Sequence, residues 1–524
     1  MSLASMPSNA LAKKPFLLAL FSGGGGVVAK TLINTITIPV LLTTQGSDGF
    51  GLYVLLISLL EVVLMLELGF DAALIKLFMD LRKRDTAGYA FLLKSAHGLY
   101  GVTALAVLGC GALLSASKLG FFHVPNELAS VAQQASLLIA LEAALTLYLG
   151  YYRSILMSHG ALQWINGGEL LSFVLAPAIG LWVLLAGYGF IPYMCVRLAM
   201  MMGRCVLVIL QALRHEPSDK RPILHLDSFM QMFKLGIHGM VINVSVLVSH
   251  KLDNVIIASF LPLKSLGVFE IVFRFLGVAL RVGSKLCEGL LAVFTHLANH
   301  PEDGDAQKTA QSYFLRMSSL NLLTASLLCL LVIWYYPILF AWVSRDHIGI
   351  EDTWPIVWVA IPIVISGCLQ MPATQFLFSS GHHRFLTKTS VVAAASNLIL
   401  SIVLIHPLGL LGVALGTLIP QLIQHQGYLI RKTLQALQID GLTYVRIVYG
   451  HVASAVLAAI LVLLAARWVF QTASQFQGVE IVVMSCVTTA VAMAVWASLM
   501  FPGLLSGVLF QAVSPQAPLN CEPD

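Results

Sequence analysis

Apolar stretches long enough to cross a membrane follow one another along nearly the whole chain. A transmembrane helix needs about 20 apolar residues, and fourteen stretches of this kind are found. Hydrocarbon offers no partner to unpaired backbone groups, so single segments of this length and composition form helices there. The sequence therefore predicts an all-α polytopic membrane protein with about 14 transmembrane helices.

Short loops separate the predicted spans. In the first half the spans are 15–42, 49–78, 89–114, 129–157, 164–187 and 190–213. In the second half they are 230–257, 265–296, 309–337, 353–378, 387–406 and 409–431, followed by 446–468 and 479–500. Composition agrees with this class, because 10% of the residues are charged, whereas a soluble domain has about 25%.

Basic residues gather in alternate loops, which predicts the orientation of the chain. On one side lie Lys13, Lys14, Arg82, Lys83, Arg84, Arg214, Lys220, Arg221, Arg384, Lys388, Arg431 and Lys432. The loops on the other side contain few basic residues apart from Lys118, Lys264 and Arg345. Both termini are therefore expected in the cytoplasm. No basic block is longer than three residues, so no nucleic-acid partner is predicted.

The two halves of the chain share landmarks in the same order. Lys30 matches Lys251, Gly51 matches Gly267, Gly160 matches Gly381, and Gly189 matches Gly409, at offsets from 216 to 221 residues. An even number of spans per half predicts two six-helix lobes in parallel repeat. The predicted domains are 1–220, 221–432, two added helices in 433–510 and a disordered cytoplasmic tail, 511–524. The alternative is an accidental alignment of similar hydrophobic hairpins.

The eighth predicted span carries charge at helical spacing. At about 100° per residue, one stripe about 60° wide holds all of its charged residues: Glu270, Arg274, Arg281, Lys285 and Glu288. A charge that faces lipid near mid-membrane costs at least about 2.5–3.5 kcal/mol, so the stripe is expected to line a polar cavity. The alternative is a structural seam, since Glu270–Arg274 and Arg281–Lys285–Glu288 have pairing spacings.

Carboxylates inside the spans are candidates for ion coupling. Glu67 and Asp71 are four residues apart and share a face of the second span. They either pair with the basic span of the other half or exchange protons or bind a cation during transport. The candidate coupling or gating residues are Glu67, Asp71, Asp253, Glu270 and Glu288. No metal site is predicted, because the histidines and the eight cysteines lack ligand spacing.

Cations inside the spans predict a positive lumen between the lobes. Lys30 lies about halfway along the first span, where snorkelling to the interface is difficult. Arginine and lysine bind phosphate through charge and hydrogen bonds, so a pyrophosphate joined to sugars, with a lipid tail left in the bilayer, fits such a lumen. The candidate substrate-binding residues are Arg274, Arg281, Lys285, Lys30 and Lys251.

Short motifs in both halves resemble a known family. The motifs of the first half are Phe50-Gly51-Leu52-Tyr53 and Glu67-Leu68-Gly69-Phe70. The second half begins with Asp253-Asn254-Val255-Ile256-Ile257 and Leu266-Gly267-Val268-Phe269. Later in the same half come Gly381-His382-His383-Arg384, Asn397 and Leu408-Gly409-Leu410-Leu411-Gly412-Val413-Ala414. Together they cover most of 15–432 and resemble polysaccharide flippases (lipid-linked oligosaccharide, O-antigen type) of the superfamily that includes lipid II flippases and multidrug exporters. Phe269 and Glu67 stand where this family commonly has Tyr and Asp.

The resemblance implies a transporter rather than an enzyme. It implies that an undecaprenyl-pyrophosphate-linked oligosaccharide crosses from the cytoplasmic to the periplasmic leaflet of the bacterial inner membrane by alternating access, with H+ or Na+ as the coupling ion and no cofactor. Membrane lipid, a glycan polymerase and glycosyltransferases are the expected partners. The rival hypotheses are a lipid II-type flippase, a small-molecule (drug) antiporter and a non-transporting scaffold of a glycan assembly complex. A glycan polymerase or ligase is disfavoured because no loop is long enough for a catalytic domain.

Overall fold

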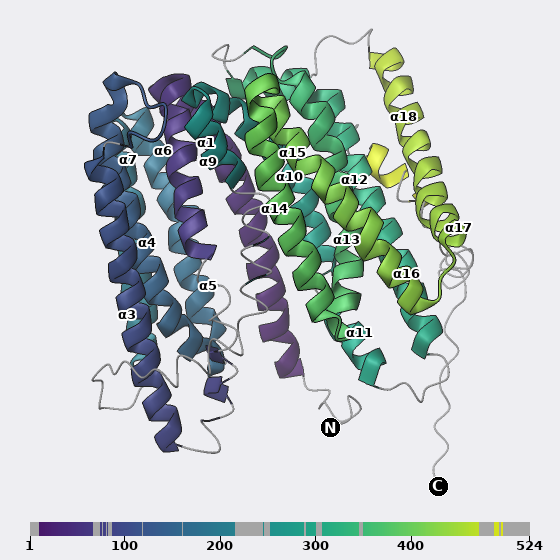
Figure 1. Cartoon of the computed structure of the whole chain (residues 1–524), viewed down its shortest axis with the longest axis horizontal. Coiled ribbons are helices and arrows are strands. Elements are labelled where there is room, and N and C mark those ends of the chain that lie inside the picture. Colours follow the sequence, from purple (N-terminus) through teal and green to yellow (C-terminus); the bar gives the residue numbers. More distant parts are fainter. Residues whose placement is uncertain are drawn as a thin grey trace. The chain divides into compact units, whose positions relative to one another are not determined.

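The computed structural model of the chain is helical (Figure 1). It describes residues 10–65, 86–117, 119–159, 161–214, 252–287, 290–299, 306–344 and 349–470, with a few positions in 74–81, 241–245 and 487–495, and for 10–32 the backbone alone. Within these ranges there is no strand, which confirms the predicted all-α class. Among the described residues, nine helices are long and apolar enough to span a membrane, and the total of fourteen stays a prediction.

Several helices begin and end within a few residues of the predicted spans. These are α3 (Thr86–Ala116), α4 (Ala129–Ser158), α7 (Phe190–Ala212), α13 (Trp354–Ser379) and α14 (His383–Leu408). Helix α12 (Ala306–Ser344) begins three residues before its predicted span and ends seven residues after it. The fifth span is divided into α5 (Leu162–Leu170), the π-helical segment Leu171–Leu175 and α6 (Ala176–Leu185), which has Pro177 in its first turn. Proline is tolerated there because the first N–H groups of a helix have no intrahelical partner.

Breaks between helices fall at glycines. The first two predicted spans are joined in α1 (Ala10–Met65), which has one non-helical residue, Gly46, at φ 72°. The turns predicted at Gly189 and Gly409 are confirmed, since their φ angles are 87° and 56°. Glycine adopts such angles without the steric cost that a Cβ brings, so the chain reverses within very few residues.

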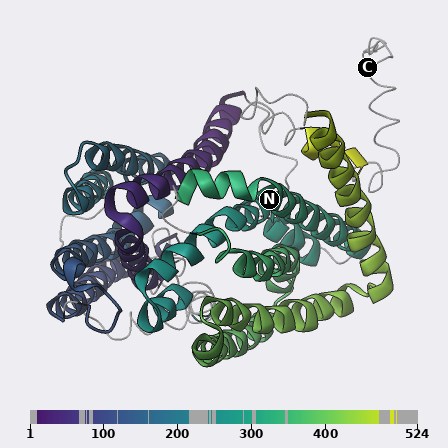
Figure 2. The same cartoon turned by 90° about the horizontal axis from the view of Figure 1, so that it is seen from above.

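The chain divides into two compact units. The first consists of residues 1–274, 338–357 and 387–420, and the second of 275–337, 358–386 and 421–524. In the first unit α3, α4, α5, α6 and α7 lie side by side (Figures 1 and 2). Their core is rich in aromatic residues, including Tyr151 and Tyr152, whose rings meet edge to face at 4.9 Å. The predicted domain boundaries stay predictions.

The first unit also contains α9 (Leu252–Phe260), the start of α10 (Leu263–Cys287) and most of α15 (Leu410–Leu422). Most of the seventh predicted span, before Leu252, lies outside the described residues. Asn254 of α9 donates a hydrogen bond of 2.8 Å from Nδ2 to Ser58 Oγ of α1. This buried bond ties α9 to α1.

The second unit packs around its own apolar core. It contains α11 (Leu290–Asn299), most of α12 and α13, α16 (Arg431–Leu437), α17 (Gly441–Tyr444) and α18 (His451–Phe470), with π-helical segments Ile423–Ile430 and Val445–Gly450. Phe314 stacks on Tyr444 with ring centroids 5.8 Å apart, and Phe294 meets Phe376 edge to face at 5.5 Å. Aromatic contacts of these kinds add to the stabilisation from buried area.

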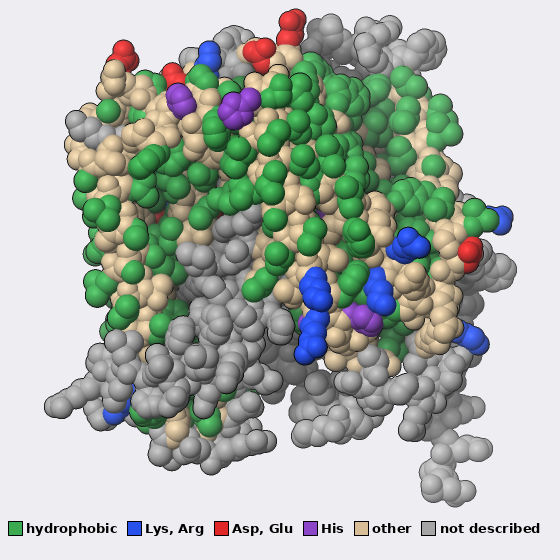
Figure 3. All heavy atoms as spheres, viewed as in Figure 1, with side chains coloured by type: hydrophobic (Ala, Val, Ile, Leu, Met, Phe, Trp, Pro, Cys, Tyr) green, Lys and Arg blue, Asp and Glu red, His purple; other side chains and the backbone are tan. Residues whose placement is uncertain are grey.

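Hydrophobic side chains also cover the outer faces of the helices (Figure 3). Leu113, Trp182 and Ile399 are each more than 60% exposed. Apolar patches of this extent are rare on soluble monomers. Their exposure to lipid has no free-energy cost, because lipid tails are as apolar as these side chains. Together with the long apolar helices, this surface is that of a multi-pass membrane protein.

Two glycines that are matched in the predicted repeat lie at one crossing of α1 and α10. A Cβ on Gly51 would overlap the carbonyl oxygen of Leu263, and a Cβ on Gly267 would lie 2.9 Å from Phe50 Cδ1. Small residues allow membrane helices to approach closely. The two positions therefore serve one close contact between helices of different halves.

We predict that Gly51→Ala destabilises the protein, because the added methyl group collides with backbone that has no room to move. Overpacking of this kind costs about 1–3 kcal/mol, so the thermal transition of purified protein in detergent is expected to fall by several degrees. Gly101→Ala in α3 is the control, since a Cβ there meets nothing within 4 Å. Equal melting temperatures for the two variants would contradict the close contact.

Candidate functional site

Helix α10 has one packed face and one polar face. Leu276, Ala279 and Cys287 are buried, and Cys368 of α13 donates a hydrogen bond of 3.5 Å from its Sγ to the carbonyl oxygen of Ala279. A Cβ on Gly283 would lie 3.2 Å from the same sulfur. The side of this helix opposite the predicted charged stripe is therefore the side that packs in the second unit.

The first ion pair of the predicted stripe is present. Arg274 donates to Glu270 Oε1 from Nη2 at 2.6 Å and from Nε at 3.0 Å, and the two side chains are 18% and 21% exposed. Hydrogen bonds between two ionised groups are stronger than neutral ones. Removing one partner of such a pair leaves the other charge unpaired in a poorly solvated place, which is costly.

The next two cations of the stripe, Arg281 and Lys285, are exposed. They lie about two and three turns beyond Arg274 along α10, and Ser284 between them is exposed as well. The guanidinium Nη1 of Arg281 lies 3.6 Å from where a Cβ of Gly277 would be, so this glycine leaves room for the guanidinium group. Both cations are therefore accessible on the face opposite the packed side of α10, and they are not enclosed in the core.

A second arginine–glutamate pair lies deep in the first unit. Arg197 of α7 donates to Glu142 of α4, from Nη2 to Oε1 at 2.8 Å and from Nε to Oε2 at 3.4 Å. Tyr193 lies beside Arg197, and its ring meets that of Tyr53 edge to face at 5.9 Å. Tyr53 is also close enough to interact electrostatically with Arg274. Both pairs therefore border the same tyrosine of α1.

Other predicted site residues are less well described. Lys30 lies in α1, where only its backbone is described. Glu67, Asp71, Lys251 and Glu288 lie outside the described residues. Their proposed roles in coupling and substrate binding stay predictions.

Asp253 of α9 belongs to a buried polar network that also includes residues of α14 and α15. Thr417 of α15 donates from Oγ1 to Asp253 Oδ2 at 2.7 Å, and Asn397 of α14 donates from Nδ2 to Thr417 Oγ1 at 2.8 Å. The three residues are 3%, 2% and 2% exposed in the order Asp253, Asn397 and Thr417. A carboxylate this deep in an apolar bundle is expensive, so such groups usually have a function.

Two buried oxygen atoms of this network accept no hydrogen bond from the described residues. Within the described part of the chain, Asp253 Oδ1 and Asn397 Oδ1 are buried without a hydrogen-bond partner. Thr417 Oγ1 and Ser401 Oγ both lie within hydrogen-bonding distance of the Val413 carbonyl oxygen, at 3.2 and 3.5 Å. A set of carboxylate, amide, hydroxyl and carbonyl oxygens suits a proton or a hard cation such as Na+.

Sequence reasoning selected Asp253 but missed its partners. Asn397 was noted for the family resemblance alone, and Thr417 and Ser401 were not singled out. One signal was available, because Asn397 and Ser401, and likewise Val413 and Thr417, are four residues apart and share helix faces. Glu142 and Arg197 were recognisable as charges within apolar spans, but nothing in their spacing paired them.

Solved structures of transporters share this fold. The chain is similar to the lipid II flippase MurJ in an inward closed conformation, with a TM-score of 0.70 and 13% identity over 92% of this chain and 99% of that one. It is similar to an inward-facing multidrug resistance MATE family transporter of the MOP superfamily (TM-score 0.61, 13% identity, 78% and 95% covered). A MATE transporter of Vibrio cholerae matches with a TM-score of 0.56 at 15% identity, covering 83% and 99%.

At the level of sequence, no curated protein matches the chain. A family profile described as "polysaccharide biosynthesis protein" does match, over residues 45–333, which is more than half of the chain. That range includes the Phe50–Tyr53 motif, the Asp253 segment and the cationic face of α10. On this evidence the chain belongs to the polysaccharide biosynthesis protein family.

Proposed function

We propose that this protein is a flippase that moves an undecaprenyl-pyrophosphate-linked oligosaccharide from the cytoplasmic to the periplasmic leaflet by alternating access. One observation carries the proposal: Arg281 and Lys285 are exposed on one face of α10, while the opposite face is packed. In a member of a polysaccharide biosynthesis family with a transporter fold, an accessible cationic face within a spanning helix suits a phosphorylated head group.

The depth of these cations supports an aqueous path. Arg281 lies near the middle of the predicted span 265–296, about 22 Å along a helix from its C-terminal end. By the predicted orientation this end faces the cytoplasm, where the head group first meets the protein. Each cation turned toward lipid would cost at least about 2.5–3.5 kcal/mol near mid-membrane, which favours a water-filled cavity.

The Arg274–Glu270 pair has a different role in this proposal. Its arginine side chain is only 18% exposed, so it is less accessible to an incoming head group than the exposed cations. It lies deeper along α10, beside Tyr53 and Glu61 of α1. We propose that this pair holds α1 and α10 together. A diphosphate would separate the two helices by competing with Glu270 for the guanidinium group.

Asp253 supports the ion-coupling part of the proposal. Its carboxylate connects α9 to α14 and α15 through Thr417, and one of its oxygens is left without a partner among the described residues. Binding a proton or Na+ there changes the charge at a junction of three helices. Such a change biases the equilibrium between two conformations if their affinities for the ion differ.

The rival transport hypotheses differ in the charge that they require. A lipid II-type flippase also carries a diphosphate, so it shares the need for Arg281 and Lys285. A small-molecule antiporter for cationic drugs needs an acidic cavity, and the exposed cations of α10 disfavour it. A scaffold needs neither the cations nor Asp253.

We predict that Arg281→Gln/Lys285→Gln reduces glycan export at least about tenfold, because two charge-assisted phosphate contacts are lost. The measurement is surface glycan in a bacterial strain lacking the protein, normalised to the amount of variant in the inner membrane. Arg384→Gln/Lys388→Gln is the matched control, since it also removes two exposed cations four residues apart. Normal export by the α10 variant, or an equal defect in the control, would refute the head-group role.

We further predict that Asp253→Asn makes transport insensitive to ion gradients, because the amide neither binds a proton nor neutralises Na+. Transport by full-length protein in proteoliposomes is compared with and without pH and Na+ gradients. Ser58→Ala is the control, as it breaks the buried hydrogen bond of the adjacent Asn254 and leaves the carboxylate. If Asp253→Asn responds to the gradients as the unmodified protein does, Asp253 is not the coupling residue.

A further inference from the structure

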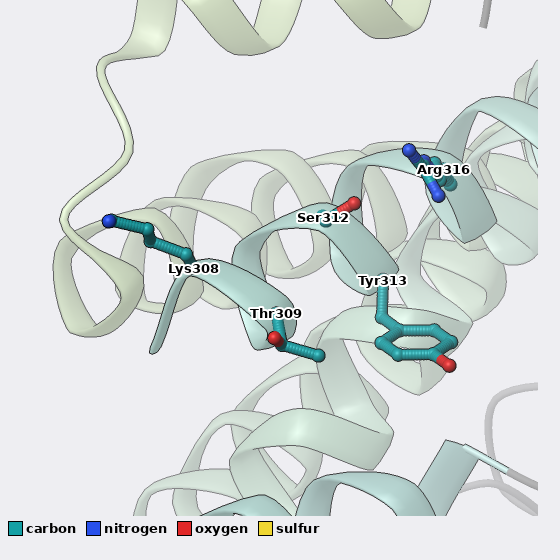
Figure 4. Close-up of a pocket in the computed structure, with 5 residues that line it drawn as sticks. All are labelled: Lys308, Thr309, Ser312, Tyr313 and Arg316. Atoms are coloured by element: carbon teal, nitrogen blue, oxygen red, sulfur yellow. The ribbon is translucent and has the colours of Figure 1, made fainter. Parts of the chain in front are cut away.

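A polar pocket lies on the first turns of α12, away from the residues discussed above. The "α12 pocket" has a volume of about 360 Å³ and is lined by Lys308, Thr309, Ser312, Tyr313 and Arg316. Lys308 lies at one end of this row and Arg316 at the other, with the hydroxyl side chains between them (Figure 4). The described lining thus contains two cations, three hydroxyl groups and no carboxylate.

Helix geometry separates this pocket from the core. At about 100° per residue the five lining residues fit within an arc about 140° wide. Ala310 and Phe314, on the other side of the helix, are buried in the core of the second unit. Gln311 anchors the same turns by donating from Nε2 to the carbonyl oxygen of Leu437 at 2.7 Å. The pocket is therefore held on a firmly packed helix.

The length of α12 places the pocket at the level of lipid head groups. Its 39 residues are about 58 Å long, whereas the hydrocarbon core is about 30 Å thick. The long segment without charged residues begins only after Arg316 and continues to Arg345. By the predicted orientation, the turns before it project at the cytoplasmic face.

Tyr313 gives independent support for this level. Its side chain is 44% exposed, and tyrosine is enriched at the boundary between hydrocarbon and water, where its ring and hydroxyl each find a suitable environment. Lys308 and Arg316 flank it, and long basic side chains at this level reach the phosphate region. The pocket thus combines the groups that recognise a phosphate with the depth at which lipid phosphates occur.

We propose that the α12 pocket binds the phosphate of a membrane lipid head group, with Lys308 and Arg316 as its cations. The hydroxyl groups of Thr309, Ser312 and Tyr313 donate hydrogen bonds to the remaining phosphate oxygens. A phospholipid and a polyprenyl diphosphate offer the same chemistry to these groups. The inference does not use Arg281, Lys285 or Asp253, so it stands independently of the proposed function.

The test measures binding of defined probes to the full chain in neutral detergent by native mass spectrometry. The probes are undecaprenyl diphosphate, phosphatidylglycerol and inorganic diphosphate. Lys308→Gln/Arg316→Gln is expected to weaken lipid binding about tenfold or more, because two charge-assisted contacts are lost. Thr309→Val/Ser312→Ala keeps both charges and is expected to weaken it about two- to fivefold.

Arg384→Gln/Lys388→Gln is again the matched control, with the same change in charge at the start of α14. A selective loss of undecaprenyl diphosphate binding supports the pocket and identifies an isoprenoid lipid as its source of phosphate. An equal loss for both lipids supports a general head-group site, and a loss for inorganic diphosphate as well shows that phosphate alone suffices. Unchanged binding by the pocket variant, or an equal loss in the control, overturns the proposal. Glycan export by the same variants is scored separately, so failure of one proposal is distinguishable from failure of the other.

Discussion

Hydrocarbon supplies no hydrogen-bond partner, and the rest of this structure depends on that constraint. Each spanning segment satisfies its backbone internally as a helix, and polar side chains within the spans find partners on the same helix or on another one. Arg197 binds Glu142, Arg274 binds Glu270, and Asp253 accepts from Thr417. In contrast to these buried or half-buried groups, Arg281 and Lys285 are exposed. Those exceptions define the proposed transport path.

The same constraint explains why close helix contacts use glycine. With no gain from excluding water between helices, membrane helices associate through tight packing. Gly51 and Gly267 provide it where α1 meets α10: Gly51 packs against Leu263, and Gly267 packs against Phe50. Tyr53, two residues after Gly51, borders both arginine–glutamate pairs. The crossing and the Arg274–Glu270 pair are neighbours on α10, beside Tyr53 of α1, whereas the Arg197–Glu142 pair joins α7 to α4. A conformational change that separates these helices therefore has to rearrange packing and ion pairs together.

Much of the fold was predictable, and less of the site. The bounds of α4 and α7, the turns at Gly189 and Gly409 and the packed side of α10 all followed from local patterns. The choice of Asp253 as a functional candidate followed from its depth in an apolar span. Its partners did not, because Thr417 is 164 residues away in the chain. The pairing of Glu142 with Arg197 across 55 residues was hidden for the same reason.

By itself, the amino-acid sequence determined that this chain forms membrane-spanning helices, where many of them begin and end, and which face of α10 is polar. These properties depend on interactions within one or two helical turns. Only the tertiary structure decided that Asp253 and Asn397 both meet Thr417, that Gly51 meets Leu263, and that the row of cations and hydroxyls on α12 lies opposite a packed face. Contacts of that kind depend on which helices become neighbours, and the many apolar helices of this chain are too alike in composition for local pattern to choose among them.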